Sequence, residues 1–208
     1  MPPRLKFQKE EIVQAALDLA AARGIEAVTA RELARKLGVS VGPIFTYFDS
    51  MEQLRAEVCA RARALYREQL ESGLADPIPF LGLWRQYSRF AREQPELYKL
   101  LFLTKPGAGS GGAMESLRLS QELARPSLMR IYRMDEHTAD CYFRDLWLTA
   151  FSFATLIVTE DCPYTEEEML AIGTEISLAV CKAYKEIPGL PAGDYDRDAI
   201  FRQLVKEN

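Results

Sequence analysis

The chain has 208 residues, 48% of them hydrophobic, so it can bury a core as one helical domain with a small appendage and needs no disulfide or metal to fold. Its formal charge of −4 argues against a protein coated with basic residues for nonspecific binding to nucleic acid. The sequence shows no apolar run of membrane-spanning length and no signal peptide, so we expect a cytoplasmic protein with no membrane partner.

Positive charge is slightly concentrated at the start of the chain. Residues 1–50 hold seven Lys/Arg and six Asp/Glu, a net charge of +1, so the remainder carries −5. Affinity for phosphate would therefore rest on few cations and would fall with salt, unless two such segments act together. In the arm formed by residues 1–7, Arg4 and Lys6 can reach phosphates or the minor groove, and an ordinary frayed terminus is the alternative.

Two helices are predicted at the start of the chain. Residues 8–23 carry an apolar face and end at Gly24. Thr29, with Glu32 three residues later, is a capping box that begins the second helix, and Gly38 ends it because glycine readily adopts the left-handed conformation of helix C-termini. The apolar face of the first helix consists of Ile12, Ala16, Leu19 and Ala20.

A tight turn then leads to a predicted short third helix of unusual composition. Ser40 can cap it, small residues occupy its first turn and aromatic residues follow. The leading residues of such a helix can meet base edges in a DNA major groove, which is about 12 Å wide. An αα-hairpin with its aromatic residues in a bundle core is the alternative. The small residues are Val41, Gly42 and Pro43, and the aromatic ones are Phe45, Tyr47 and Phe48.

Residues 8–58 resemble the N-terminal DNA-binding domain of the TetR family of transcriptional regulators. One register runs through A-A-L-D-L, R-G-I-E-A-V-T, L-A-R-K-L-G-V-S, F-T-Y-F and E-Q-L, over about a quarter of the chain. The resemblance implies an all-α fold, with a three-helix helix-turn-helix domain in residues 1–50 and a larger helical effector-binding and dimerisation domain in residues 51–208. It implies two partners, a palindromic double-stranded DNA operator and a small-molecule effector.

The resemblance also assigns residues that contact DNA. Thr29 and Arg31, at the front of the second helix, would hold phosphates, and Tyr47 matches an aromatic or histidine position that usually does so. The family often has tyrosine in place of Phe45 and lysine in place of Met51, so one hydroxyl and one cation are missing here. Either operator affinity is lower, or the N-terminal arm with Arg4 and Lys6 compensates. The positions expected to face bases are Ser40, Val41, Gly42, Pro43 and Thr46, and Phe45 belongs to the same contacting segment.

The rest of the chain is predicted to form a helical body. Ser50, with Gln53, can cap a helix that runs to about residue 72 and is long enough to connect the DNA-binding head to the body. Residues 83–102 resemble the ligand-binding domain of a TetR subgroup named for a Trp-His-Gly signature. In the matching later stretch, residues 147–154, phenylalanine and serine stand where the signature has His-Gly.

Residues 105–112, K-P-G-A-G-S-G-G, are predicted to form a flexible loop. They are not a phosphate-binding loop, because no strand precedes them and the Lys-Ser/Thr pair is missing. A helix over residues 114–132 follows and should bend near Pro126.

Two long helices, residues 136–159 and 165–185, are the most apolar part of the chain. Thr165 and Glu168 form a capping box for the second. A helix that is apolar nearly all round must bury more than one face. The resemblance implies that this pair forms a four-helix interface in a homodimer, with burial inside one subunit as the alternative. Residues 188–208 end in an amphipathic stretch, a short docking helix of unassigned role.

An effector pocket is expected among the helices that follow residue 50. Its candidates combine aromatic and polar groups, which favours an apolar or aromatic, drug-like effector, although each of them also suits an ordinary core. A lipid, an antibiotic and an acyl thioester all remain compatible. The candidate pocket residues are Tyr66, Trp84, Tyr87, Tyr98, Phe102, Tyr132 and Trp147.

The sequence does not support an enzyme, a metal site or a cofactor. His137, the only histidine, follows two acidic residues at a helix start, where a solvated or capping role is expected, and no Ser/His/Asp set can be assembled. The cysteines lack zinc-site spacing and are expected to be buried, reduced thiols, with a redox switch as the alternative. The cysteines are Cys59, Cys141, Cys162 and Cys181.

These features predict a homodimeric repressor that places two recognition helices in successive major grooves about 34–36 Å apart. An effector that binds the DNA-competent and incompetent states with different affinities would release it. The alternative is a ligand-independent DNA-binding regulator or activator that acts through a protein partner. A helical enzyme or a purely structural dimer is the third possibility.

Overall fold

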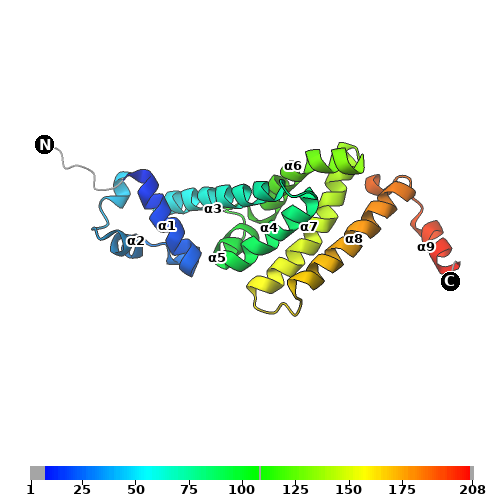
Figure 1. The fold of residues 1–208 in the computed structure, drawn as a ribbon. Helices are drawn as coiled ribbons and strands as arrows, with labels where there is room; N and C mark the ends of the chain where they lie inside the picture. The colour runs from blue at the N-terminus through cyan, green and yellow to red at the C-terminus, as the bar shows by residue number, and fades with distance from the viewer. Residues whose placement is uncertain (1–7, 108, 207–208) are drawn as a thin grey trace.

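The protein is all-α, as predicted (Figure 1). The computed structural model describes residues 8–107 and 109–206, and this part of the chain forms nine α-helices and no strand. The head (residues 8–50) lies at one end, the body (α4 to α8) in the middle, and α3 runs from one to the other. The helices are α1 (Lys9–Arg23), α2 (Ala30–Leu37), α3 (Met51–Gly73), α4 (Pro79–Glu93), α5 (Pro95–Tyr98), α6 (Gly112–Tyr132), α7 (Glu136–Val158), α8 (Glu166–Glu186) and α9 (Arg197–Lys206).

Side-chain caps begin the helices of the head. Thr29 Oγ1 accepts the N–H of Glu32 at 3.2 Å, as predicted, but the Thr29 N–H donates to the Ala27 carbonyl. Only half of the expected capping box therefore forms, and the Glu32 carboxylate binds arginines instead. At α1 the Glu11 carboxylate accepts the N–H of Gln8 at 2.7 Å, a contact that the sequence analysis missed because glutamine is not a preferred N-cap residue.

The third helix predicted for the head is not an α-helix in the structure. Residues 38–47, which we call the tip, form turns and one short 3-10 helix, η2 (Ile44–Thr46), instead of an α-helix. The N–H groups of residues 44, 46 and 47 donate three residues back, and Pro43, not Ser40, precedes η2. Gly42 and the β-branched and aromatic residues after it favour helix weakly.

Helix α3 is shared by the head and the body. Ser50 Oγ accepts the N–H of Gln53 at 3.2 Å and begins the helix as predicted, while Gln53 Oε1 accepts the N–H of Asp49 at 2.7 Å. Leu54 and Val58 are fully buried where α3 packs on α1, and the later turns of α3 pack along α4. The domain boundary at residue 50 stays a prediction.

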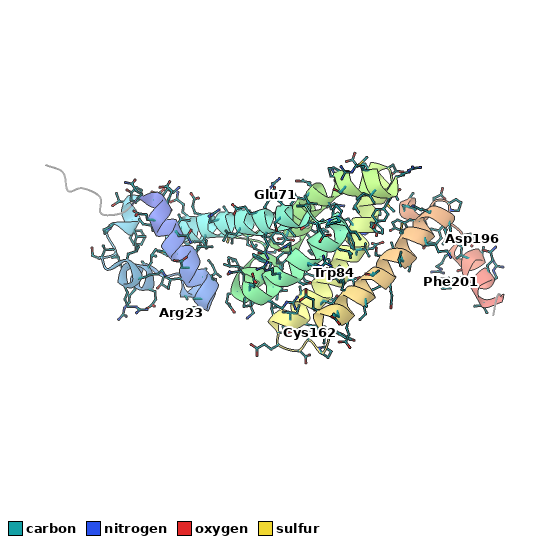
Figure 2. All side chains as sticks on the ribbon, in the orientation of Figure 1. Arg23, Glu71, Trp84, Cys162, Asp196 and Phe201 are labelled. Carbon is teal, nitrogen blue, oxygen red and sulfur yellow. The ribbon has the colours of Figure 1, made fainter. Side chains whose placement is uncertain are left out.

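Two close approaches between helices set the packing of the body. Trp84 of α4 lies in the middle of the body, where α8 reaches it through Gly173 (Figure 2). A Cβ at Gly173 would lie 2.8 Å from the Trp84 ring, so a larger residue there would push α8 away. Helices α3 and α4 meet through Gly73 and Gly82, where an added Cβ would collide with backbone.

The helix bounds of the C-terminal half follow the predictions closely. Thr165 and Glu168 form the complete capping box at the start of α8. The predicted loop lies between η3, a π-helix over Lys99–Leu103, and α6, and Arg63 donates to the Gly109 carbonyl in it at 2.8 Å. Helix α6 continues through Pro126, and the bend there stays a prediction. Helix α9 projects from the end of the molecule opposite the head and exposes most of its apolar side chains (Figure 1).

Helix α7 corrects one expectation from composition. In the described part of the chain it is the one helix that is long and apolar enough to cross a membrane. The prediction that the sequence contains no such run was therefore wrong for this segment. Half of its most apolar window is buried, because α7 packs against α4, α6 and α8. A core helix of a soluble protein has the same composition, so this signal is weak.

Candidate nucleic-acid interface and effector site

The tip is held from inside by buried side chains. Gly38 ends α2 with a left-handed backbone at φ 65°, and the N–H of Val39 donates to the Ala34 carbonyl at 3.0 Å. Ile44 and Phe48 are almost completely buried in the head core. These contacts hold the tip at its start, at Ile44 within it and at Phe48 just after it. The position of its outer surface is therefore fixed even though it contains no α-helix.

The outer surface of the tip carries most of the residues predicted to face bases. The side chain of Val41 is 44% exposed and that of Phe45 is 46% exposed, whereas Pro43 and Tyr47 are half-buried. Apolar groups with this exposure can pack on thymine methyls or sugars once a duplex covers them. The exposed residues of the predicted set are Ser40, Val41, Gly42, Phe45 and Thr46.

The front of α2 adds two exposed groups. Thr29 uses its hydroxyl as the helix cap, and Arg31 lies in the first turn, where the N–H groups and helix dipole favour an anion. Both positions suit phosphate binding. Direct contact of these residues with DNA stays a prediction.

Ion pairs within the protein occupy most cations of the described head, and sequence reasoning missed them. Lys9 pairs with Glu57 at 2.6 Å and Lys36 with Asp18 at 3.4 Å. Arg35 and Arg23 both bind Glu32, at 2.9 and 2.7 Å, and their hydrogen bonds, that of Arg35 foremost, lower the pKa of this carboxyl. Among the lysines and arginines of residues 8–50, Arg31 has no carboxylate partner. Arg4 and Lys6 lie outside the described residues.

A small cavity lies in the body, and four of the seven predicted pocket residues line it. Its volume is about 30 Å³, and no charged side chain lines it. The predicted residues in its wall are Tyr66, Trp84, Tyr87 and Trp147, joined by Ser120 and six apolar residues, Leu70, Phe80, Leu83, Phe143, Leu146 and Ala150.

The other three predicted pocket residues lie elsewhere. Tyr98 and Phe102 are buried behind the cavity, with their rings stacked at 4.4 Å between centroids. Tyr132 lines a separate cavity of about 20 Å³ between α4 and α6. Burial raises the pKa of Tyr66 and of Tyr87, and raises the pKa of Tyr98 to about 12. Four of the seven predicted residues therefore surround one small cavity, and contact of any of the seven with an effector stays a prediction.

The single histidine does not sit in either site. His137 Nε2 lies 3.1 Å from the Pro191 carbonyl oxygen and 3.7 Å from Cys141 Sγ. The described residues contain no group of three or more His, Cys, Asp or Glu that can hold a metal ion. Cys59 and Cys141 are buried as predicted, but Cys162 and Cys181 are only half-buried, because Cys162 follows the end of α7 and α8 is sparsely covered.

The architecture defines a class of protein. A small helical head that exposes a tight turn, joined by one long helix to a larger helical body, is the arrangement of a helix-turn-helix DNA-binding protein with a separate body.

Residues 12–58 match the sequence model of the family described as "Bacterial regulatory proteins, tetR family". The chain therefore carries, near its N-terminus, the DNA-binding domain of the TetR family of transcriptional regulators. The match covers α2, the tip and the first turns of α3, and so contains the predicted DNA-contacting residues.

Similar proteins agree with this assignment. The chain is 26% identical over 106 residues to the uncharacterized HTH-type transcriptional regulator YobS of Bacillus subtilis (strain 168), over 50% of this chain and 56% of YobS. It thus spans about half the length of this curated relative.

Two solved structures share the fold. One is BioQ with its double-stranded DNA operator, at 18% identity and a TM-score of 0.53, over 84% of this chain and 99% of BioQ. The other is Thermus thermophilus FadR with lauroyl-CoA, at 24% identity and a TM-score of 0.50, over 85% of this chain and 94% of FadR.

Proposed function

We propose that this protein is a cytoplasmic, homodimeric transcriptional repressor that binds a palindromic operator and is released by a small molecule bound in its body. The observation that carries the proposal is the tip. A segment matched by the family sequence model exposes Val41 and Phe45 while Ile44 and Phe48 hold it to the head core. BioQ, which has a similar fold, is solved with its DNA operator.

The surface of α8 supports the homodimer. Only three of its 21 residues, Met169, Gly173 and Ser177, are buried within one chain. Leu178 is 67% exposed, and Leu148 on the neighbouring helix α7 is 50% exposed. A helix with this much uncovered apolar surface gains stability by packing on a partner, and a two-fold axis through α7 and α8 would pair two heads for two half-sites.

The cavity supports effector control less strongly, which keeps the second candidate function open. A volume of about 30 Å³ is far below the roughly 300–1,000 Å³ of drug-sized pockets, so an effector must open the body as it enters. FadR of Thermus thermophilus, which shares the fold, is solved with lauroyl-CoA. A regulator or activator that needs no ligand and acts through a protein partner is the alternative that the filled core favours.

The test of DNA binding is selection of genomic fragments by the purified chain, followed by footprinting of the selected DNA. We expect protection of a palindrome whose half-sites lie about one or more helical turns apart. Phe45→Ala should weaken binding. Protection without palindromic symmetry would contradict the dimeric mode, and no selected fragment at all would contradict the regulator function.

Light scattering, which measures molar mass, tests the proposed dimer. Leu178→Glu should shift the protein toward monomer and weaken operator binding, because it places a charge in an apolar interface. Met114→Glu is the matched control, because Met114 is as well exposed but lies on α6. If the double variant with Leu178→Glu and Leu148→Glu is still a dimer, the interface lies elsewhere.

A further inference from the structure

Helix α8 exposes a stripe of residues on the face opposite its buried side. Its buried residues, Met169, Gly173 and Ser177, recur at intervals of four. Positions two residues further along point to the other side of the helix, and there the chain has two apolar residues between an acidic and a basic one. This outer stripe consists of Glu175, Leu178, Ala179 and Lys182, all of them exposed.

Neither charge of the outer stripe has a close partner within the chain. Lys182 Nζ lies 3.9 Å from the Glu186 carboxylate, the outer limit of an ion pair, and the Lys182 side chain is 72% exposed. The Glu175 carboxylate forms no ion pair with the residues that the structure describes. Both charges are therefore available to a partner that covers this face.

The order of the charges makes the outer stripe complementary to its own copy. A two-fold axis perpendicular to α8 brings two copies of the helix together antiparallel, so that each contact occurs twice. With the axis between Leu178 and Ala179, Glu175 faces Lys182 of the partner subunit. Leu178 then lies against the partner's Ala179, a large side chain beside a small one.

Other registers of the same pairing bring like charges together. A slip of seven residues in one direction places Glu175 against the partner's Glu175, and a slip in the other direction places Lys182 against the partner's Lys182. Like charges opposite one another destabilise an interface. Such a slip also moves the partner by about 10 Å along α8, at 1.5 Å per residue. One register is thus favoured, and with it one separation of the two heads.

We propose that the outer stripe of α8 sets the register of the homodimer, with Glu175 bound to the partner's Lys182 on both sides of the two-fold axis. The partner is a second copy of this chain, because the stripe has the charge order that its own antiparallel copy requires. The proposal rests on the dimer of the proposed function and adds the contacts that select its register.

Charge reversal tests this pairing. Glu175→Lys brings two positive charges together at both symmetric contacts, and Lys182→Glu brings two negative charges together. Each variant should dimerise roughly ten- to hundredfold more weakly than the wild type, measured by analytical ultracentrifugation over a dilution series. Glu122→Lys is the matched control, because it makes the same change of charge at an exposed position of α6. It should change the dissociation constant by less than about threefold.

Two combinations restore opposite charges at the contacts. The variant that carries both Glu175→Lys and Lys182→Glu exchanges the charges within one chain and should dimerise much more tightly than either single variant. A mixture of the two single variants, one of them fluorescently labelled, should form heterodimers, because both contacts then pair a positive with a negative charge. A general loss of stability in α8 would produce neither rescue.

Single variants that dimerise as tightly as Glu122→Lys would overturn the proposal, and so would a double variant no tighter than the single ones. If a reversed variant fails to fold, Glu175→Gln and Lys182→Gln remove the attraction without adding repulsion. Each should weaken the dimer about threefold, with no further loss when they are combined, because the same interaction is lost. Additive losses would overturn the proposal.

The outcomes also separate this proposal from the proposed function. A wild-type chain that stays monomeric over the whole dilution series overturns both. Single variants that behave like the control leave the proposed dimer standing and remove only its register. A dimer that shows both rescues yet selects no DNA fragment would leave the register standing and contradict the regulator.

Discussion

The head and the body differ in how far they expose their aromatic side chains. In the head, Phe45 and Phe48 lie three residues apart, and one is 46% exposed while the other is 1% exposed. In the body, aromatic rings face inward and pair with one another, as Tyr66 does with Phe90 and Phe102 at 5.2 Å between centroids. The head thus keeps apolar surface available for a large, flat partner, and the body keeps its apolar surface away from water.

Charge separates the two regions as well. The described head neutralises most of its own cations by ion pairs at its surface, leaving Arg31 without a carboxylate. The body buries hydroxyl groups in hydrogen-bonded pairs, Tyr66 with Ser120 and Tyr87 with Tyr98. An anionic partner can therefore meet the head with little competition at one position, whereas no charged side chain lines the cavity inside the body.

The largest expected effect comes from the two phenylalanines of the tip. Phe48→Ala should lower the free energy of unfolding by about 3–5 kcal/mol, the usual cost of emptying a buried aromatic site. Phe45→Ala should change it by less than about 0.5 kcal/mol, because the side chain is already half in water. Denaturant unfolding measures both. Equal losses of stability in the two variants would show that the tip packs differently.

Alkaline pH should act on the body. Burial raises the pKa of Tyr98 to about 12, so the folded state keeps a proton that the unfolded state releases near pH 10. The stabilisation is complete below pH 10 and declines as the pH rises from 10 to 12, by about 1.4 kcal/mol per pH unit for this group. Unfolding titrations from pH 8 to 12 measure the slope, and Tyr98→Phe should reduce it. A slope unchanged by Tyr98→Phe would show that this hydroxyl ionises freely.

The cap of α2 should have a smaller effect, confined to the head. Thr29→Ala removes the acceptor of the Glu32 N–H and should cost about 1 kcal/mol of stability. Thr29→Ser keeps that oxygen and serves as the control. Amide hydrogen exchange should show faster exchange in α2 for the alanine variant and unchanged exchange in α7. Loss of protection across the body would contradict a local role.

The smallest effect is expected at a single cation. Arg31→Ala should weaken binding to the selected DNA and reduce the slope of log affinity against log salt by about one, as the loss of one phosphate contact does. Arg35→Ala is the control, because Arg35 is bound to Glu32 at 2.9 Å and should change the slope less. A larger change for Arg35 would mean that the ion pair opens on DNA.

Sequence reasoning located the head and both long C-terminal helices because their signals are local. Thr29, Gly38, Ser50 and Thr165 cap or end helices through atoms only a few residues away, and the structure confirms each of these roles. The same reasoning failed at the tip, where it assigned a helix to residues that form turns and a 3-10 helix. There the prediction rested on Ser40 as a helix cap, and the weak helix formers after Gly42 counted against it.

By itself, the sequence determined the helical class and the order of the long helices, since hydrophobic period and capping act within one or two turns. Tertiary structure alone decided which cations stay free and which aromatic residues share a cavity. Tyr66 and Ser120 are 54 positions apart and still form one hydrogen bond. Such contacts depend on how whole helices pack, and no local pattern in the chain encodes their distance.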